Sequence, residues 1–272
     1  MPQTINAVFL TEDVKNWLAN SRQPKILHVF DEVCNLINER REILSVVVAE
    51  IGNGPFNLVV EEPVIFAKHL DAESKVSIHD EQITIGEIIV SLANAQMWNP
   101  APKWGDLRKN KSEIANRLAL LQIDHENESI LQFSNSLALA IINADIPTAK
   151  SVSSKLAGLG IGLTPAGDDF LMGAMYAVWI LHPQDVAKKI TEEIANVAVP
   201  LTTSLSGAWL RSAAKGEAGE LWHEFFTALI EDKNIYLPMS KILSVGETSG
   251  SDALAGFLDV LKSKAGATRP EK

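Results

Sequence analysis

The stretch Gly158-Leu-Gly-Ile-Gly-Leu-Thr-Pro-Ala-Gly-Asp-Asp-Phe-Leu-Met-Gly173 combines five glycines with a pair of adjacent aspartates, and an apolar run follows it to Leu181. A run of this length and composition is typical of a buried helix. Thr164 is a preferred N-cap residue, and Pro165 suits the first helical position, where no N–H donor is needed. The stretch therefore predicts a glycine-rich loop that ends at the start of a buried helix.

This predicted helix start is a candidate site for a small anion, because the first N–H groups and the helix dipole are partly positive. Glycines let the backbone approach a ligand closely. The stretch has neither the Lys-Ser/Thr of a nucleotide phosphate loop nor the glycine spacing of a dinucleotide site. The alternative is a tight loop whose glycines only allow close helix packing. The predicted ligand contacts in this stretch are Gly160, Gly162, Thr164 and Gly167.

The last predicted helix repeats these features in Gly246-Glu-Thr-Ser-Gly-Ser-Asp252. Asp252 follows Thr248 by four residues, as Asp168 follows Thr164, so each aspartate lies about one turn above a threonine on the same face. We expect the two helix starts to face each other across one pocket, with Asp168 and Asp252 as catalytic carboxylates that accept N–H bonds from an amide. The predicted ligand contacts on this side are Thr248, Ser249 and Gly250.

Asp169 is a third candidate catalytic carboxylate, although acids in a first helical turn also act simply by stabilising the helix dipole. Asp168 and Asp169 together leave Mg²⁺ open as a cofactor, because Mg²⁺ needs only one or two protein carboxylates. The sequence has no His-x-x-x-His or Cys-x-x-Cys spacing for zinc and no Gly-x-Ser-x-Gly motif of a serine hydrolase. No other cofactor is indicated.

A third polar segment, Thr202–Gly216, combines small hydroxyl residues with one arginine. Ser204 and Ser206 are candidate ligand-binding hydroxyls. Arg211 can bind an anion through two parallel hydrogen bonds, and a structural ion pair explains it equally well. We include Ser204 and Arg211 among the predicted ligand-binding residues.

The composition favours a water-soluble globular protein with an acidic surface. Of 272 residues, 46% are hydrophobic and 21% are charged, and the net charge is −10. We therefore expect neither nucleic acid nor an anionic membrane as a partner. One cysteine, Cys34, allows no internal disulfide. The N-terminus lacks a signal-peptide pattern, and the longest apolar run is too short to span a bilayer, so we expect a cytoplasmic protein.

Residues 1–100 predict a β-rich half. The runs Ile26–Phe30 and Ile43–Ile51 are rich in aliphatic and β-branched residues. Gly52-Asn-Gly-Pro55 predicts a turn, and Phe56–Val60 is then the expected hairpin partner of the second run.

Further short runs complete this half. Val76–His79 and Gln82–Ile85 predict a second hairpin around Asp80-Glu81, and Ile88–Val90 predicts a strand or the beginning of a short helix. The charged end of Glu32–Arg41 predicts a surface turn. Several short strands at regular spacing indicate a small barrel or sandwich.

The pattern changes at Asn94–Gly105, where two prolines, two tryptophans and a glycine predict a rigid loop at a domain boundary. We read Trp98 and Trp104 as core residues in preference to a ligand-stacking pair. The predicted fold class is α+β, with a β-rich domain over residues 1–100 and an all-helical domain over residues 106–272. The expected helices are 112–121, 129–142, 146–156, 165–181, 184–198, 202–215, 217–231, 238–244 and 248–264.

Three motifs in this order resemble the AllH family, long catalogued as a domain of unknown function. They are Gly-Leu-Gly-Ile-Gly-Leu-Thr-Pro-Ala-Gly-Asp-Asp (158–169), Ser-Leu-Ser-Gly-Ala-Trp-Leu-Arg-Ser-Ala-Ala-Lys-Gly (204–216) and Gly-Glu-Thr-Ser-Gly-Ser-Asp-Ala-Leu-Ala-Gly-Phe (246–257). The Gly-Asn-Gly-Pro-Phe turn (52–56) and Met-Trp-Asn-Pro-Ala-Pro-Lys-Trp (97–104) also look like the family. The Leu-Thr-Pro-x-x-Asp-Asp core is the most specific part.

The best-known member of that family is a subunit of the heteromeric oxamate carbamoyltransferase of allantoin and purine breakdown. The resemblance therefore implies a carbamoyltransferase subunit that assembles with other subunits and binds carbamoyl phosphate or a small anionic amide such as oxamate. Two alternatives stay open: a non-catalytic ligand-binding or assembly subunit, and an independent Mg²⁺-dependent enzyme that uses Asp168 and Asp169.

Overall fold

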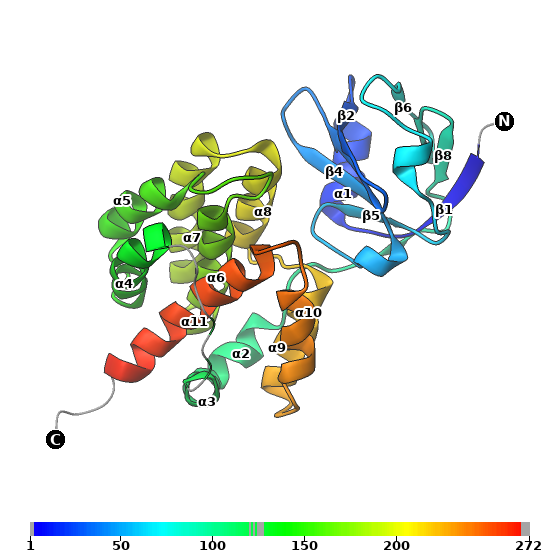
Figure 1. Cartoon of the computed structure of the whole chain (residues 1–272). Coiled ribbons are helices and arrows are strands. Elements are labelled where there is room, and N and C mark those ends of the chain that lie inside the picture. Colours follow the sequence, from blue (N-terminus) through cyan, green and yellow to red (C-terminus); the bar gives the residue numbers. More distant parts are fainter. Residues whose placement is uncertain (1–2, 120, 122, 124–127, 268–272) are drawn as a thin grey trace. The chain divides into compact units, whose positions relative to one another are not determined.

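The computed structural model describes residues 3–119, 121, 123 and 128–267. The chain forms two units, Met1–Pro100 and Ala101–Lys272. The first holds the strands and the second holds helices α2 to α11 (Figure 1). This arrangement confirms the predicted fold class, a β-rich half followed by an all-helical half. Among the described residues, no helix is both long enough and apolar enough to cross a membrane.

The first unit is a barrel that is nearly closed. Its main strands are hydrogen-bonded in the order β2-β3-β4-β5-β1-β8-β7-β6, and one bridge between Lys25 and Lys75 links the two ends of this series. Strand β9 extends the sheet beside the end of β1. The elements are β1 (Gln3–Leu10), α1 (Glu12–Asn20), β2 (Lys25–Val29), β3 (Val33–Ile37), β4 (Ile43–Val48), β5 (Asn57–Val60), β6 (Val76–His79), β7 (Gln82–Ile85), β8 (Ile88–Ser91) and β9 (Gln96–Met97), with 3₁₀ turns at Ala49–Ile51 and Phe66–Lys68.

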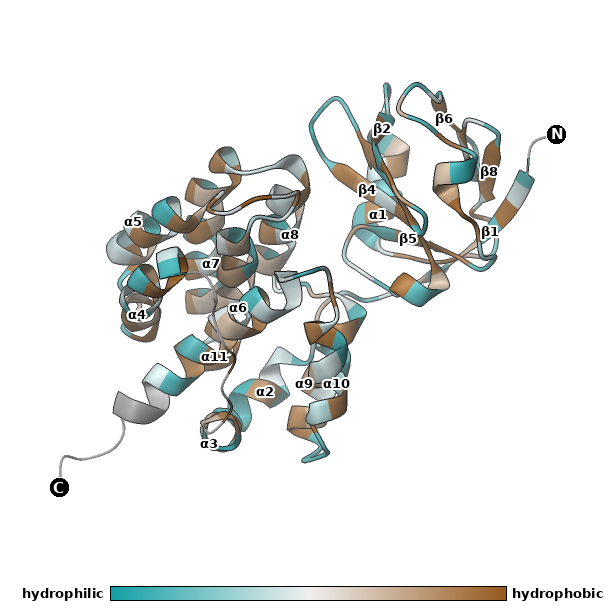
Figure 2. Ribbon diagram, in the orientation of Figure 1, coloured by the Kyte–Doolittle hydropathy of each residue, from teal (hydrophilic) through white to brown (hydrophobic). Residues whose placement is uncertain are grey.

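Alternate side chains of the strands fill the barrel. On β4, Leu44, Val46 and Val48 are buried in its core, and Figure 2 colours this strand as hydrophobic. Period-2 alternation directs these three residues to the same face. Helix α1 adds Val14, Trp17 and Leu18 to the same core, at the spacing of one helical face. We had no prediction for this helix, although Thr11 caps it by accepting a hydrogen bond from the Val14 N–H.

The predicted hairpin between residues 43–51 and 56–60 is wrong. Strands β4 and β5 pair in parallel, with Ser45 opposite Asn57. The chain leaves β4 through the 3₁₀ turn Ala49–Ile51 and returns along the strand, and the Ser45 N–H then donates to the carbonyl of Phe56. Gly-Asn-Gly-Pro therefore belongs to a return crossover, which short-range turn statistics do not distinguish from a hairpin.

Three other sequence predictions have different outcomes. The hairpin of β6 and β7 is confirmed, with His79 opposite Gln82 around the Asp80 turn. Ile88–Val90 lies in strand β8. The segment Glu32–Arg41 contains a strand that we missed, β3, which pairs with both β2 and β4 before the turn at Arg41.

The second unit contains the predicted helices, preceded by a short additional one, α2. All begin or end within a few residues of the expected positions. They are α2 (Trp104–Lys109), α3 (Lys111–Leu118), α4 (Glu128–Ile142), α5 (Ile146–Leu156), α6 (Ala166–Leu181), α7 (Gln184–Ala198), α8 (Ser204–Lys215), α9 (Glu220–Ile230), α10 (Tyr236–Leu243) and α11 (Ser249–Ala267), with a 3₁₀ turn at Val199–Leu201.

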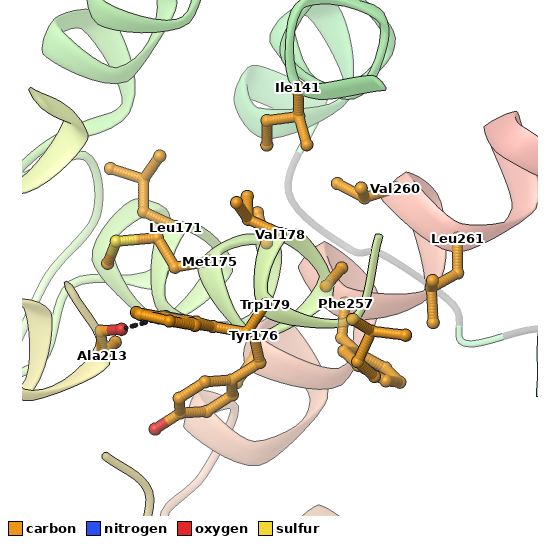
Figure 3. Packing of buried hydrophobic residues seen from close by; sticks show 14 of the residues in the cluster. Ile141, Leu171, Met175, Tyr176, Val178, Trp179, Ala213, Phe257, Val260 and Leu261 are labelled. Carbon is orange, nitrogen blue, oxygen red and sulfur yellow. Dashed lines mark hydrogen bonds between the residues drawn. The ribbon is translucent and has the colours of Figure 1, made fainter. Parts of the chain in front are cut away.

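Helix α6 is the centre of this unit. Every residue from Gly167 to Leu181 is buried except Met172, which is half-buried. A helix that is apolar on all sides must be covered on all sides. Figure 3 shows side chains of α6 facing different neighbours: Trp179 donates to the carbonyl of Ala213 on α8, and Phe257 of α11 lies in the same cluster.

Glycines let α6 and α11 cross at backbone distance. A Cβ atom on Gly173 would lie 1.7 Å from the carbonyl oxygen of Ala253, and one on Gly256 would lie 2.0 Å from that of Phe170. Real Cβ atoms do not approach backbone oxygens so closely, so neither helix tolerates a side chain at the crossing. The crossing holds the first turns of α6 and α11 near each other.

Trp104 is a core residue, as we expected. Its indole N–H donates to the carbonyl of Gly216 at 2.7 Å, and its ring stacks on Tyr176 and Trp179 of α6. Gly216, with φ of 78°, ends α8 in the left-handed conformation and packs directly on Trp104. The tryptophan thus ties the start of the helical unit to α6 and α8.

We expect Gly173→Ala or Gly256→Ala to lower the free energy of unfolding by about 1–3 kcal/mol, because the added methyl forces the crossing apart. Urea unfolding followed by helical circular dichroism measures this. Gly105→Ala is the matched control: it also lies in a helix, nothing lies within 4 Å of its Cβ position, and alanine there should stabilise by about 0.5–1 kcal/mol. Equal unfolding midpoints for the crossing variants and the natural chain would contradict the steric account.

Candidate functional site

The starts of α6, α8 and α11 meet around the glycine loop, residues 157–165. The carbonyl of Leu201, just before α8, lies against Gly158. The Thr203 hydroxyl donates to the carbonyl of Leu163 at 2.6 Å. On the other side of the loop, the hydroxyls of Thr164 and Ser249 are hydrogen-bonded at 2.9 Å. The loop therefore joins the starts of α8 and α11 to that of α6, and these three starts form the candidate site.

The loop depends on glycine at several positions. Gly158, Gly160 and Gly162 have φ values of 71°, 120° and 93°, which side chains of L-residues rarely adopt. A Cβ on Gly160 would lie 2.9 Å from the Ala166 backbone nitrogen, at the first residue of α6, whereas Gly162 faces open space. The loop thus follows the start of α6 closely, as predicted.

The predicted capping role of Thr164 is wrong. Pro165 occupies the N-cap position, with φ of −53° and ψ of 141°, and no side chain caps α6. The Thr164 hydroxyl instead reaches Ser249 on α11. The helix begins one residue later than we expected, and this frees Thr164 to connect two helices.

Asp168 is 2% exposed and faces the loop and α8. Its Oδ1 accepts the Gly158 N–H at 2.9 Å, and its Oδ2 accepts a short hydrogen bond from the Thr202 hydroxyl. Burial raises the pKa of Asp168 above its usual value, and hydrogen bonds from Thr202 and Gly158 oppose that rise. The carboxyl group is thus held in place from two segments.

Asp169, 5% exposed, faces α11 instead. Burial raises its pKa to about 8; hydrogen bonding from Ser249 and Thr164 lowers it, and the nearby charges of Asp252 and Asp168 raise it further. Its Oδ2 is buried without a hydrogen-bond partner among the described residues. A buried acceptor in this state is costly, so this oxygen is the strongest sign that the site takes a ligand.

Asp252 is 6% exposed, and its charge acts on Asp169. The structure therefore brings the predicted pair of helix starts together, but Asp169 is the aspartate of α6 that meets α11. Adjacent helical residues point about 100° apart. Asp168 is consequently directed to α8, and the matched Thr-to-Asp spacing of the two motifs did not identify the interacting pair.

Other predicted ligand contacts occupy different places. A Cβ atom on Gly167 would lie 2.0 Å from the carbonyl oxygen of Leu156, and one on Gly250 would lie 1.8 Å from that of Ile242. Close packing therefore accounts for both glycines. Thr248 is exposed and directly precedes α11. Ser204 begins α8, and Arg211 is exposed farther along that helix beside Gly207.

Sequence reasoning missed Thr202 and Thr203. Thr203 caps α8 through a hydrogen bond from the Ser206 N–H, and Thr202 reaches Asp168. The Thr-Thr-Ser run before a predicted helix is a cap signal, and it would have marked Thr203. No sequence signal predicts the hydrogen bond between Thr202 and Asp168. Among the described residues, no group of three or more acidic, histidine or cysteine side chains is arranged to hold a metal ion.

Comparison with known families covers both units. Residues 156–261, which include all three helix starts, match the model described as oxamate carbamoyltransferase subunit AllH. Residues 6–97, which include most of the barrel, match the AllH family N-terminal domain. The chain belongs to the AllH family. No solved structure matches the chain. The AllH match places the acidic helix starts inside the main family domain.

We expect Asp169→Asn to flatten the dependence of stability on pH. The folded pKa of about 8 exceeds the ordinary value of 3.8, so the contribution of Asp169 is fully present below about pH 4 and is lost as pH rises towards 8. The loss is at most about 1.4 kcal/mol per pH unit for one group. Urea unfolding between about pH 5 and pH 9 measures the slope.

Asp145→Asn is the control for this experiment. Asp145 caps α5, and its hydrogen bond from Thr148 lowers its pKa, so its contribution is lost only in acid. Asp145→Asn should keep the natural slope above about pH 5. A natural slope in Asp169→Asn as well would mean that Asp169 is ionised in the folded chain.

Proposed function

We propose that this chain is a subunit of a heteromeric carbamoyltransferase, and that it binds a small anion with a carbamoyl or amide group at the starts of α6, α8 and α11. The observation that carries the proposal is the buried oxygen of Asp169, without a partner among the described residues, at helix starts inside the family match. Oxamate and carbamoyl phosphate both have an amide-like end and an anionic end.

The amide-like end suits the aspartates. A carbamoyl group presents an NH₂ donor and a carbonyl acceptor side by side. With a pKa of about 8, Asp169 is mostly protonated at neutral pH and can donate to the carbonyl. An ionised aspartate accepts from the NH₂ group, and Asp168 is positioned by Gly158 and Thr202 for this role. One protonated and one ionised carboxyl group together match an amide and reject a carboxylate.

The anionic end suits the backbone of the helix starts. First-turn N–H groups and the helix dipole attract a carboxylate or phosphate. The glycine loop lies beside the first residue of α6 without side chains at Gly160 and Gly162. Ser204, Thr248 and Ser249 are the predicted polar ligand contacts at the other two helix starts. A ligand lying across these starts has its amide end at the aspartates.

Carbamoyl transfer to oxamate forms a bond between the amide nitrogen and the carbamoyl carbon. It breaks the carbon–oxygen bond to phosphate, and the proton that the amide nitrogen loses is taken up by the departing phosphate. Such a reaction is accelerated by fixed donors that position both reactants and stabilise the developing oxyanion. A covalent nucleophile is not required. In this proposal, other subunits supply the remaining groups that catalysis needs. The assembled enzyme acts in allantoin and purine nitrogen breakdown.

We expect the isolated chain to bind oxamate, and Asp168→Asn to weaken this binding about tenfold or more, the usual effect of losing a hydrogen bond to a charged group. Titration calorimetry measures it, and oxalate, which has a carboxylate in place of the amide, should bind more weakly. Asp185→Asn is the matched control, because Asp185 is an exposed first-turn aspartate of α7. If Asp168→Asn and Asp185→Asn bind oxamate equally well, Asp168 does not bind the ligand and only stabilises the helix.

Phosphate release from carbamoyl phosphate in the presence of oxamate tests the catalytic role. We expect little phosphate release by the chain alone and rapid release by the complex co-expressed with its other subunits. When that complex carries Asp168→Asn, the rate of release should fall by about tenfold to a thousandfold. Full activity of an assembled Asp168→Asn complex would instead assign this chain an assembly role. Robust turnover by the single chain would contradict the requirement for partners.

A further inference from the structure

Exposed aliphatic side chains lie on the segments that lead into the three helix starts of the acidic site. Ile161, in the glycine loop, is 95% exposed, Leu201 before α8 is 53% exposed, and Val245 before α11 is 45% exposed. We call these three residues the aliphatic rim. Single exposed apolar residues are common on proteins. Here, however, each of the three helix starts that form the site has one.

The rim residues belong to segments that contact one another. The glycine loop contacts the segment before α8 through Gly158 and Leu163, and it contacts α11 through Thr164. Val245 is joined to the start of α11, because its carbonyl accepts the Gly250 N–H at 3.1 Å. Helix α10, which ends at Leu243 just before Val245, also has large exposed apolar side chains. They are Tyr236, Leu237 and Leu243.

The charged residues of the three segments that form the site have one sign. Segments 157–169 and 244–252 contain aspartate or glutamate, segment 199–206 contains no charged residue, and none of the three contains lysine, arginine or histidine. The described contacts of Asp168 and Asp169 are with hydroxyls, a backbone N–H and other aspartates, and none of these is a cation. A complementary surface is therefore apolar with a lysine or arginine at its centre. A second copy of this chain would bring the same acidic groups and be repelled.

We propose that the aliphatic rim is the docking surface for a different protein chain, whose basic side chain enters the acidic centre between α6, α8 and α11. This inference rests on the proposed function, because the same cation can bind the phosphate of carbamoyl phosphate. Arginine suits both tasks, since its planar group forms paired hydrogen bonds with carboxylates and with phosphates.

The apolar and charged parts of this surface act together. Aliphatic contacts around the edge exclude water from a central charged contact, and charge pairs are stronger where water is excluded. Ile161 is 95% exposed in the described part of the chain, whereas in the docked state it would bury most of its side chain. Docking also closes the site over a bound substrate.

The test uses the complex formed when this chain is co-expressed with the other carbamoyltransferase subunits. Ile161→Asp and Leu201→Asp should each weaken subunit association by about tenfold or more, through loss of apolar burial and addition of like charge. Leu139→Asp is the matched control, because Leu139 is 45% exposed on α4, outside the three segments of the rim. A photo-crosslinking residue at position 161 should attach to another subunit, and one at position 139 should not.

Unchanged association of both rim variants, or crosslinks from position 161 only to a second copy of this chain, would overturn the docking proposal. Oxamate binding by the isolated natural chain, measured beside the association of the rim variants, separates the two proposals. If the natural chain binds oxamate and the rim variants lose the complex, both stand. If the natural chain does not bind oxamate but the rim variants still lose the complex, the docking surface stands and the proposed ligand site is wrong.

Discussion

The backbone contact between α6 and α11 is the constraint on which the helical unit depends. Gly173 and Gly256 each face a carbonyl oxygen of the opposite helix, so the two helices touch without intervening side chains. Close approach maximises the packing of the apolar residues on both sides of the crossing. It also fixes the first turns of α6 and α11 relative to each other, where Thr164 and Ser249 share a hydrogen bond.

This crossing explains why three aspartates are buried near each other. Burial of carboxyl groups opposes folding, and the raised pKa values of Asp168 and Asp169 express that cost. Hydroxyls and the Gly158 N–H offset part of it, but Oδ2 of Asp169 keeps no partner among the described residues. Buried polar atoms without a hydrogen-bond partner lower the stability of the folded chain, and they are typical of binding sites. A bound ligand supplies the missing hydrogen bond.

The same three helix starts also produce the surface around the acids. Each start is preceded by a turn that exposes an aliphatic residue, at Ile161, Leu201 and Val245. In the proposed site, a carboxyl-rich centre beside exposed aliphatic residues would take a small polar ligand and would be complementary to a basic protein surface. Ligand binding and subunit association would therefore affect the same carboxyl groups.

The sequence by itself determined the β-rich and helical halves, the positions of most helices and the loop at the start of α6. These features follow from local periodicity, glycines and caps. Only the tertiary structure decided that β4 and β5 run in parallel, because a return crossover and a hairpin share the same turn residues. Only it decided that Asp169 meets α11 while Asp168 meets Thr202, since adjacent helical residues diverge by about 100°. Which faces meet depends on the crossing of α6 and α11, and contacts between distant segments set that crossing.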